Sequence, residues 1–264
     1  MAFTRLLVGK VVAITGATTG IGRAIALEMS RQGAKVAVNY YPDETQTANA
    51  MSLKIEILEI VKEDGDAWFH AVAGDISLPE TGRQLVKETV EKFGKLDVFV
   101  SNAGICPFND FFTITEEIVY KTVNTNLTGA YFAVQAAARQ MKEQGTGGSI
   151  IGISSISALV GGEYQTHYTP TKAGILSLMQ SCAVALGKYG IRCNALLPGT
   201  IRTGINEDDL SGDKGEHMSL RVPLGRLGVP EDLAGPAVFL ASEFARYVTG
   251  AQILVDGGLF VNLQ

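Results

Sequence analysis

Residues 10–22 read KVVAITGATTGIG, an apolar run that ends at Thr15 and leads through three glycines into an amphipathic stretch. The apolar run is typical of a buried strand, and the stretch over 20–32 is typical of a helix. Glycines between the two allow a tight turn and a close approach of phosphate, whose charge the N–H groups at a helix start can bind. The glycines alone could also form a tight turn without a ligand. In this position they predict a dinucleotide-binding turn made of Gly16, Thr19, Gly20, Ile21 and Gly22.

Outward from this unit, short apolar runs alternate with longer amphipathic ones. Most of the short runs are apolar on both faces, as in a parallel sheet covered by helices on both sides. Seven strands with intervening helices predict an α/β fold with a Rossmann-type, doubly wound, mostly parallel seven-stranded sheet. The expected strands are 10–15, 34–39, 67–73, 96–102, 148–154, 191–197 and 251–256, and the expected helices are 20–32, 43–63, 79–93, 115–144, 166–189 and 230–242.

The domain organisation is simple. No internal repeat and no Ser/Pro-rich linker divides the chain, so we expect a single domain over 1–264. Residues 204–225 interrupt the alternation because they are polar, charged and rich in glycine. An insertion of this kind between a strand and the last helix is a candidate substrate lid.

Composition narrows the expected partners and compartment. The 22 Lys and Arg against 27 Asp and Glu give a formal net charge of −5 without a basic run, which argues against nucleic acid or an anionic membrane as a partner. No apolar run approaches the roughly 18 residues of a membrane span, and the N-terminal residues lack a secretory signal. Three cysteines without CxxC spacing and three histidines without ligand companions argue against a disulfide framework and a metal site. We expect a soluble, cytoplasmic protein without a bound metal.

Tyr168 and Lys172 are four residues apart, so they lie on one face of a helix over 166–189. Pro170 is tolerated only in the first turn, which places the expected helix start near Thr166. A tyrosine with a pKa of about 10 is a poor base at neutral pH, but a neighbouring ammonium favours the phenolate and lowers that pKa. On its own, such a pair is usually a feature of the helix surface.

Six motifs, taken together and in this order, resemble the short-chain dehydrogenase/reductase family. They are the G-x-x-x-G-x-G turn at 16–22, Asn102-Ala103-Gly104, residues 124–129 around Asn126, Ser155, residues 168–172 and residues 198–203. The resemblance spans nearly the whole chain and implies an oxidoreductase dependent on NAD or NADP. It implies Tyr168 as the base, Lys172 as the group that lowers its pKa and binds the nicotinamide ribose, and Ser155 as the holder of the substrate oxygen. Asn126 would order a water that passes protons to Lys172.

The same resemblance implies a cofactor site. Besides the glycine turn, Tyr168 and Lys172, it comprises Tyr40, Asp75, Ile76, Asn102, Gly104, Pro198, Gly199, Ile201 and Thr203. An acidic residue after the second strand favours NAD, and a nearby arginine favours NADP. Tyr40 stands at the acidic position, and Thr18-Thr19 lack the arginine common in NADP-preferring relatives. Asp43 and Glu44 would repel an additional phosphate. The sequence therefore weakly favours NAD as the cofactor and tolerates NADP.

A narrower resemblance, strongest over 100–203 and at the C-terminus, is to sugar 1-dehydrogenases of this family that act on L-rhamnose. It implies oxidation at C1 of an aldose pyranose to a lactone. The expected sugar-binding residues are Ser155, Ser157, Gln165, Tyr168 and Thr200. The polar residues among them could instead cap loops. Two alternatives are a reductase of 3-oxoacyl or ketone substrates that uses the same four catalytic residues, and a dinucleotide sensor without catalysis.

The C-terminal segment 257–264 contains four large apolar residues, with little chain left to cover them. Exposed apolar residues of this kind tend to mark an interface, and the family resemblance implies a homotetramer of closed symmetry. We expect this tail to pack across a subunit boundary. The alternative is that it covers the core of its own subunit.

Overall fold

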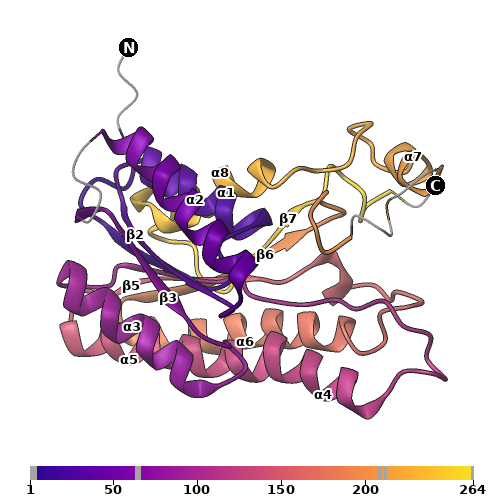
Figure 1. Ribbon diagram of the computed structural model, residues 1–264, viewed down its shortest axis with the longest axis horizontal. Helices are drawn as coiled ribbons and strands as arrows, with labels where there is room; N and C mark the ends of the chain where they lie inside the picture. The colour runs from indigo at the N-terminus through magenta and orange to yellow at the C-terminus, as the bar shows by residue number, and fades with distance from the viewer. Residues whose placement is uncertain (1–4, 63–66, 207–209, 211–212, 263–264) are drawn as a thin grey trace.

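The computed structural model describes residues 5–62, 67–206, 210 and 213–262, and one parallel sheet forms its centre (Figure 1). The strand order is β3-β2-β1-β4-β5-β6-β7, and every neighbouring pair is parallel. The strands are β1 (Val11–Ile14), β2 (Lys35–Tyr40), β3 (Phe69–Ala73), β4 (Val98–Ser101), β5 (Gly148–Ile153), β6 (Ile191–Pro198) and β7 (Gln252–Val255). The predicted doubly wound sheet is confirmed. The order reverses between β1 and β4, and open α/β sheets bind ligands beyond the carboxyl ends of the strands at such a point.

Helices cover both faces of the sheet (Figure 1). One layer contains α1 (Gly20–Arg31), α2 (Glu44–Val61) and α8 (Glu231–Ala241), and the other contains α3 (Pro79–Phe93), α4 (Glu116–Val123), α5 (Ala130–Gln144) and α6 (Thr169–Leu186). Because both faces are covered, the central strands are buried on both sides, which explains their continuous apolar runs.

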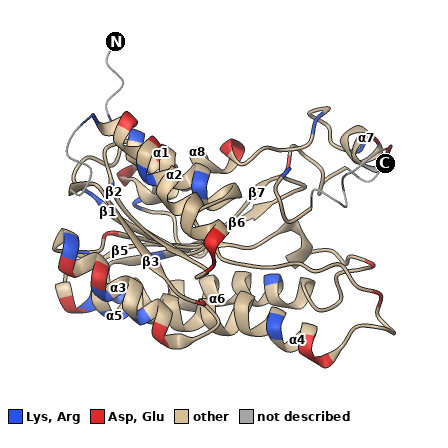
Figure 2. Ribbon diagram, viewed as in Figure 1, with Lys and Arg blue, Asp and Glu red and all other residues tan. Residues whose placement is uncertain are grey.

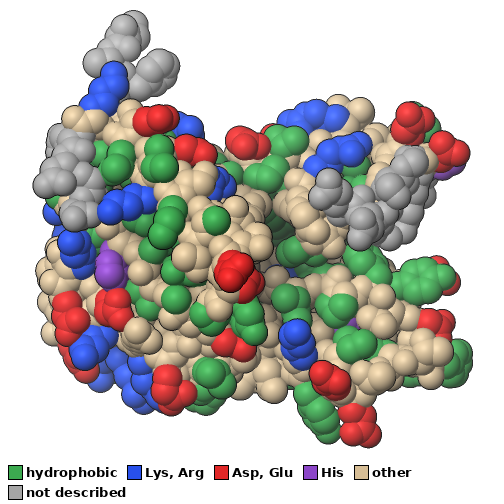
Figure 3. Space-filling view, viewed as in Figure 1, with side chains coloured by type: hydrophobic (Ala, Val, Ile, Leu, Met, Phe, Trp, Pro, Cys, Tyr) green, Lys and Arg blue, Asp and Glu red, His purple; other side chains and the backbone are tan. Residues whose placement is uncertain are grey.

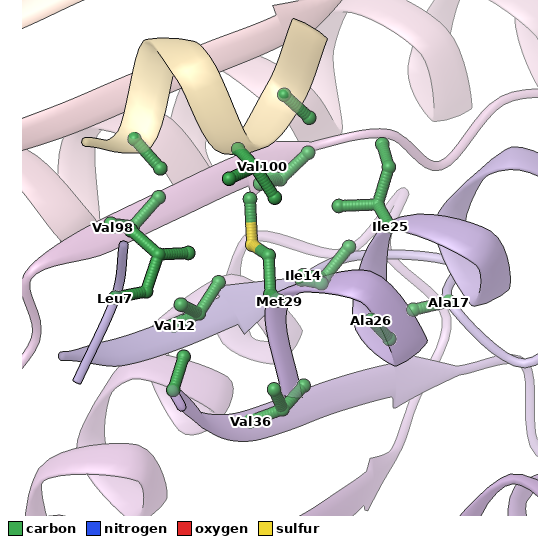
Figure 4. Close-up of a cluster of buried hydrophobic side chains, with 14 of the residues drawn as sticks. Leu7, Val12, Ile14, Ala17, Ile25, Ala26, Met29, Val36, Val98 and Val100 are labelled. Atoms are coloured by element: carbon green, nitrogen blue, oxygen red, sulfur yellow. The ribbon is translucent and has the colours of Figure 1, made fainter. Parts of the chain in front are cut away.

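Two apolar clusters fix the sheet between these layers. On one face, Ile25 and Met29 of α1 belong to a fully buried cluster with Ile14 of β1 (Figure 4). On the other face, Phe99 of β4 and Met141 of α5 are fully buried in a second cluster. Each large apolar side chain buried in this way contributes about 1.5–3 kcal/mol, so both layers hold the strand ends in place.

The helix expected over 115–144 is continuous but not uniform. Between α4 and α5, Asn124–Gly129 form a π-helical segment that contains Asn126. A Cβ on Gly129 would overlap the carbonyl oxygen of Ile76, so this segment packs backbone to backbone against the end of the β3 region. Single-turn π segments interrupt α-helices often at functional sites.

The helix expected to begin near Thr166 begins at Thr169 instead, which corrects that boundary. The carbonyl of Gln165 accepts hydrogen bonds from the N–H groups of both Tyr168 and Thr169, at 2.9 Å each, and this turn replaces the first helical turn. Tyr168 is the N-cap residue of α6, and Pro170 occupies the second helical position, where its missing N–H costs nothing.

The candidate lid over 204–225 contains an additional helix, α7 (Asp213–Leu220). Its sequence DKGEHMSL carries only Met218 and Leu220 as large apolar residues, so no amphipathic stripe signals it. Met218 packs against a small cluster of Leu210, Val222 and Leu227. Residues 207–209, 211 and 212 lie outside the described residues, and the lid stays a prediction.

Candidate active site

Close packing shapes the glycine turn between β1 and α1. Gly16 and Gly20 have φ angles of +60° and +53°, where a side chain would be strained. A Cβ on Gly16 would lie 2.8 Å from the Cα of Ala103 in the segment after β4. A Cβ on Gly22 would lie 2.6 Å from the carbonyl oxygen of Gly16. The backbone therefore requires glycine at all three positions.

The first turn of α1 has no side-chain cap. Thr19 is the N-cap residue, and its hydroxyl accepts no hydrogen bond from the helix N–H groups, while Ile21 packs against the core. Unpaired N–H groups at a helix start carry partial positive charge and bind phosphate. Thr203 lies against this turn, because its Cγ2 is 3.4 Å from the position that a Cβ on Gly20 would take. The turn and the loop after β6 thus form a cradle that fits the pyrophosphate of a dinucleotide.

Asn102 joins the end of β4 to this cradle. Its Nδ2 donates hydrogen bonds to the carbonyl oxygens of Thr15 and Gly16, at 2.9 and 2.8 Å. Its backbone N–H donates to Thr15 Oγ1 at 3.0 Å. The family resemblance assigns Asn102 to the cofactor site, and the structure adds that its side-chain amide holds the glycine turn in position.

The loop after β6 is anchored at several points. The N–H of Gly199, which follows Pro198 at the end of β6, donates to the carbonyl of Val255 at 3.0 Å. A Cβ on Gly199 would lie 2.7 Å from the Cβ of Asp256. Ile201 is buried and forms an isolated parallel bridge with Gly228. These contacts hold the loop beside the cradle.

The predicted adenosine end consists of residues at the ends of β2 and β3. Tyr40 ends β2 in register with Ala73 of β3, and Asp75 follows two residues later. The Asp75 carboxylate accepts a hydrogen bond from the Ser77 N–H at 2.9 Å, and Ile76 is buried in the core. The structure therefore places Tyr40 and Asp75 near neighbouring strand ends, while the Ile76 side chain belongs to the core.

Arg23 is a cationic residue near this end that the sequence pattern did not reveal. Its Nη1 donates to the carbonyl of Thr18 at 3.0 Å, so the guanidinium lies beside the glycine turn. Its Nη2 pairs with Glu56 of α2 at 2.6 Å. The turn therefore has a neighbouring arginine after all, although a carboxylate already neutralises it.

The four predicted catalytic side chains converge. A Cβ on Gly104 would lie 3.3 Å from Asn126 Oδ1 and 3.4 Å from Lys172 Nζ, so these two groups flank the same glycine. Lys172 Nζ lies 5.5 Å from the centre of the Tyr168 ring. The Ser155 side chain lies close enough to the Tyr168 phenol to influence its pKa. A side chain at position 104 would therefore press on both groups, and the absence of one lets them approach this backbone closely.

Asn126 connects three elements. It is 1% exposed, and its Oδ1 accepts from the Ile105 N–H at 2.8 Å. Its Nδ2 donates to the Ile105 carbonyl at 2.8 Å and to Thr171 Oγ1 at 3.2 Å. The amide therefore ties the loop after β4 to α6, the helix that carries Lys172.

Burial sets the protonation of the central pair. Lys172 is 5% exposed, its Nζ donates to the Ile153 carbonyl at 3.0 Å, and burial lowers its pKa to about 8. Burial raises the pKa of Tyr168, Cys106 adds to this effect, and the neighbouring Ser155 opposes it. The predicted lowering of the Tyr168 pKa by Lys172 is therefore not seen in this structure, because burial disfavours the charged form of both groups.

Among the predicted sugar-binding residues, two adjoin the catalytic group and one lies in the loop after β6. Ser157 donates its N–H to Ser155 Oγ at 3.0 Å, and Gln165 Nε2 donates to Cys106 Sγ at 3.4 Å, so both adjoin the central group. Thr200 lies in the loop after β6, where its carbonyl accepts from the Gly228 N–H at 3.0 Å.

His167 precedes Tyr168 and is buried. Neither of its ring nitrogens has a hydrogen-bond partner among the described residues that meets ordinary geometry. Burial lowers the pKa of His167, and the Pro107 carbonyl opposes this shift, so the imidazole is neutral at pH 7.

The molecular surface carries charges of both signs and is hollowed on one side. Figure 2 shows Lys and Arg dispersed among Asp and Glu on the outer helices. Figure 3 shows that the surface is hollowed between the region of α7 and the region of α4, with hydrophobic side chains at its rim. Within the described ranges, no helix is both long and apolar enough to cross a bilayer.

Comparison with known proteins agrees with this geometry. A family described as enoyl-(acyl carrier protein) reductase matches residues 16–260. The L-rhamnose-1-dehydrogenase of Scheffersomyces stipitis is 66% identical over 99% of this chain and 100% of its own length. The L-rhamnose 1-dehydrogenase (NAD(P)(+)) of Azotobacter vinelandii is 62% identical over 98% of this chain and 100% of its own. A short-chain type dehydrogenase/reductase from Mycobacterium marinum superposes with a TM-score of 0.89 at 34% identity, over 97% of both chains.

The fold and the site define an oxidoreductase built around a nicotinamide dinucleotide. The chain belongs to the short-chain dehydrogenase/reductase family.

Proposed function

We propose that the protein oxidises the C1 hydroxyl of L-rhamnopyranose to the corresponding lactone, with NAD or NADP as the hydride acceptor. The observation that carries this proposal is the 66% identity to an L-rhamnose-1-dehydrogenase over 99% of the chain. The convergence of Asn126, Ser155, Tyr168 and Lys172 supports it, because a dinucleotide sensor would need no such group.

The cofactor, when bound, supplies the acceptor for the hydride that leaves C1. Tyr168 accepts the proton of the C1 hydroxyl as the C1–H bond breaks and the C1–O double bond forms. Ser155, which lies beside the phenol, holds the same hydroxyl oxygen in line with Tyr168. Positioned acid–base groups of this kind typically contribute about 10²–10⁴-fold to a rate.

Tyr168 and Lys172 act as one titrating unit. Lys172 Nζ lies 5.5 Å from the centre of the Tyr168 ring, and we assign the titrating proton to the two groups together rather than to one residue. The pair must lose this proton before it can accept one from the sugar. Asn126 would order a water that carries the proton onward from Lys172.

The cofactor and the sugar would contact different sets of residues. The pyrophosphate would lie on Thr19–Gly22 and against Thr203, and the adenosine beside Tyr40 and Asp75. The ring hydroxyls would meet Ser157, Gln165 and Thr200. A site that hydrogen-bonds hydroxyls rejects analogues that lack them, because its own polar groups are then left unpaired.

We propose a cytoplasmic homotetramer. A dihedral tetramer needs two different faces that each pair with their own copy, and exposed apolar side chains occur on two separate sets of elements. Tyr120, Tyr131 and Val184 are exposed on α4, α5 and α6, whereas Phe239 and Tyr247 are exposed on and after α8. The edge strand β7 is only partly buried, unlike β1 and β4.

A substrate panel tests the proposal and its main alternative. Initial rates with NAD and with NADP are measured on L-rhamnose, other free aldoses, and 3-oxoacyl and ketone substrates in the reducing direction. We expect the highest kcat/KM with L-rhamnose. A preference for 3-oxoacyl or ketone reduction would assign the chain to the alternative function.

A further inference from the structure

We propose that Gly162 and Cys106 are positioning residues that hold the Gln165 side chain in one conformation for sugar recognition. This inference rests on the proposed function, in which Gln165 contacts a ring hydroxyl.

The Gln165 side chain is fixed from two sides. On one side, its Nε2 donates a hydrogen bond to Cys106 Sγ at 3.4 Å, across to the loop after β4. On the other side, it packs on the bare backbone of Gly162. A Cβ on Gly162 would lie 3.1 Å from both the Cβ and the Cδ of Gln165 and would overlap its Oε1. Only glycine at 162 leaves room for the amide in this position.

The backbone of Gln165 is tied to the catalytic tyrosine. Its N–H donates to the Gly162 carbonyl at 3.1 Å, and its carbonyl accepts from the Tyr168 and Thr169 N–H groups at 2.9 Å. Asn109 N–H donates to the Tyr164 carbonyl at 3.1 Å, which joins the same two loops a second time. Any hydroxyl that Gln165 contacts is therefore located relative to the Tyr168 phenol.

Cys106 lies on the same side of the site as the reacting groups. It is 8% exposed and close enough to influence the pKa of both Tyr168 and Lys172. With one amide N–H directed at this sulfur, the second N–H and Oε1 of Gln165 remain to form hydrogen bonds with a sugar hydroxyl. A glutamine side chain held in this way loses little further freedom on binding, which favours both affinity and selectivity.

Gly162→Ala tests the assignment, and Gly161→Ala is its matched control, because a Cβ on Gly161 meets nothing within 4 Å. We expect Gly162→Ala to raise the KM for L-rhamnose about tenfold, equivalent to about 1.4 kcal/mol. Its kcat and its dissociation constant for the cofactor should remain close to those of the wild type. Gly161→Ala should match the wild type in all three quantities.

A second readout separates positioning from a general structural role. The penalty for removing a hydroxyl is the ratio of kcat/KM for L-rhamnose to that for its 2-, 3- or 4-deoxy analogue. We expect the wild type to show a large penalty at the hydroxyl that Gln165 binds, and Gln165→Ala to reduce it. Gly162→Ala should reduce the same penalty, and the double variant should be no worse than Gln165→Ala, because Gly162 acts through the amide that is already removed.

Cys106→Ala provides an independent variant in case Gly162→Ala does not fold, because it removes the hydrogen-bond acceptor from the opposite side. It should reduce the same deoxy-sugar penalty. Penalties that stay at the wild-type value in both variants, or effects of Gly162→Ala and Gln165→Ala that multiply in the double variant, would overturn the positioning role while leaving the proposed function intact. A wild-type protein that does not oxidise L-rhamnose would instead overturn the proposed function.

Discussion

The ammonium of Lys172 is buried beside the partly buried phenol of Tyr168, and neither charge is favoured there. Burial raises the pKa of the phenol and lowers that of the ammonium to about 8. Protonation of the pair therefore depends on pH just above neutrality. This property follows from tertiary packing, so the four-residue spacing of the two side chains could not predict it.

Tyr168→Phe removes the proton acceptor and keeps the ring. We expect kcat for L-rhamnose to fall about 10²–10⁴-fold, the usual contribution of a general base, while the dissociation constant of the cofactor stays within about twofold. Tyr247→Phe is the control, because Tyr247 is fully exposed beyond α8. A Tyr168→Phe enzyme that keeps a tenth of the wild-type kcat would contradict the assignment of the base.

The pH dependence of oxidation tests the role of Lys172. Burial lowers the pKa of Lys172 to about 8, so below that pH the ammonium keeps its proton and cannot help Tyr168 to accept one from the sugar. We therefore expect kcat/KM to rise with pH and level off above about 8. In Lys172→Ala only Tyr168 remains to lose the proton. Because burial raises its pKa, the inflection should move to higher pH. Superimposable pH–rate profiles for the two enzymes would contradict the coupling.

At the scale of elements, the strands were predictable and some helix boundaries were not. Continuous apolar runs such as β1 and β4 have one stable placement, inside a sheet covered on both faces. The start of α6 depends on the Gln165 carbonyl, which accepts hydrogen bonds from two N–H groups. A pattern of side chains carries no information about such a backbone contact. The π-helical segment at Asn124–Gly129 also could not be predicted, because six residues are too few to change the period of the apolar residues.

The end of β2 gives a test of cofactor choice. Tyr40→Asp places a carboxylate where it can accept hydrogen bonds from the ribose hydroxyls and repel a 2′-phosphate. A hydrogen bond to a charged group contributes about 1.5–3 kcal/mol, so the ratio of kcat/KM for NAD to that for NADP should rise at least about tenfold. Tyr41→Asp is the control, because the neighbouring side chain is 58% exposed. An unchanged ratio in Tyr40→Asp would show that this strand end does not meet the ribose.

At the scale of the whole molecule, only part of the C-terminal tail packs on its own subunit. Leu259 packs against the Leu210–Val222–Leu227 cluster, and the N–H of Phe260 donates to Asp256 at 2.7 Å. Val261 is 71% exposed. The first half of the tail thus covers its own subunit, which the apolar pattern alone could not distinguish from an interface, and residues 263 and 264 lie outside the described residues.

Deletion of residues 260–264 tests the assembly. We expect light scattering to show loss of the tetramer, because an exposed apolar segment that packs on a second copy stabilises the interface. Sugar KM values measured on the truncated enzyme report whether the tail also shapes a neighbouring site. A truncated protein that remains tetrameric with unaltered KM and sugar preference would show that the tail only covers its own core.

The central claim is that a hydride moves from C1 of L-rhamnose to the nicotinamide while Tyr168 accepts the hydroxyl proton. L-Rhamnose carrying deuterium at C1 tests it most directly, with the reduced cofactor and the sugar product analysed by mass spectrometry. We predict one deuterium in each reduced nicotinamide and one molecule of lactone formed for each. Reduced cofactor without deuterium, or no reduction of NAD or NADP by this sugar, would contradict the account.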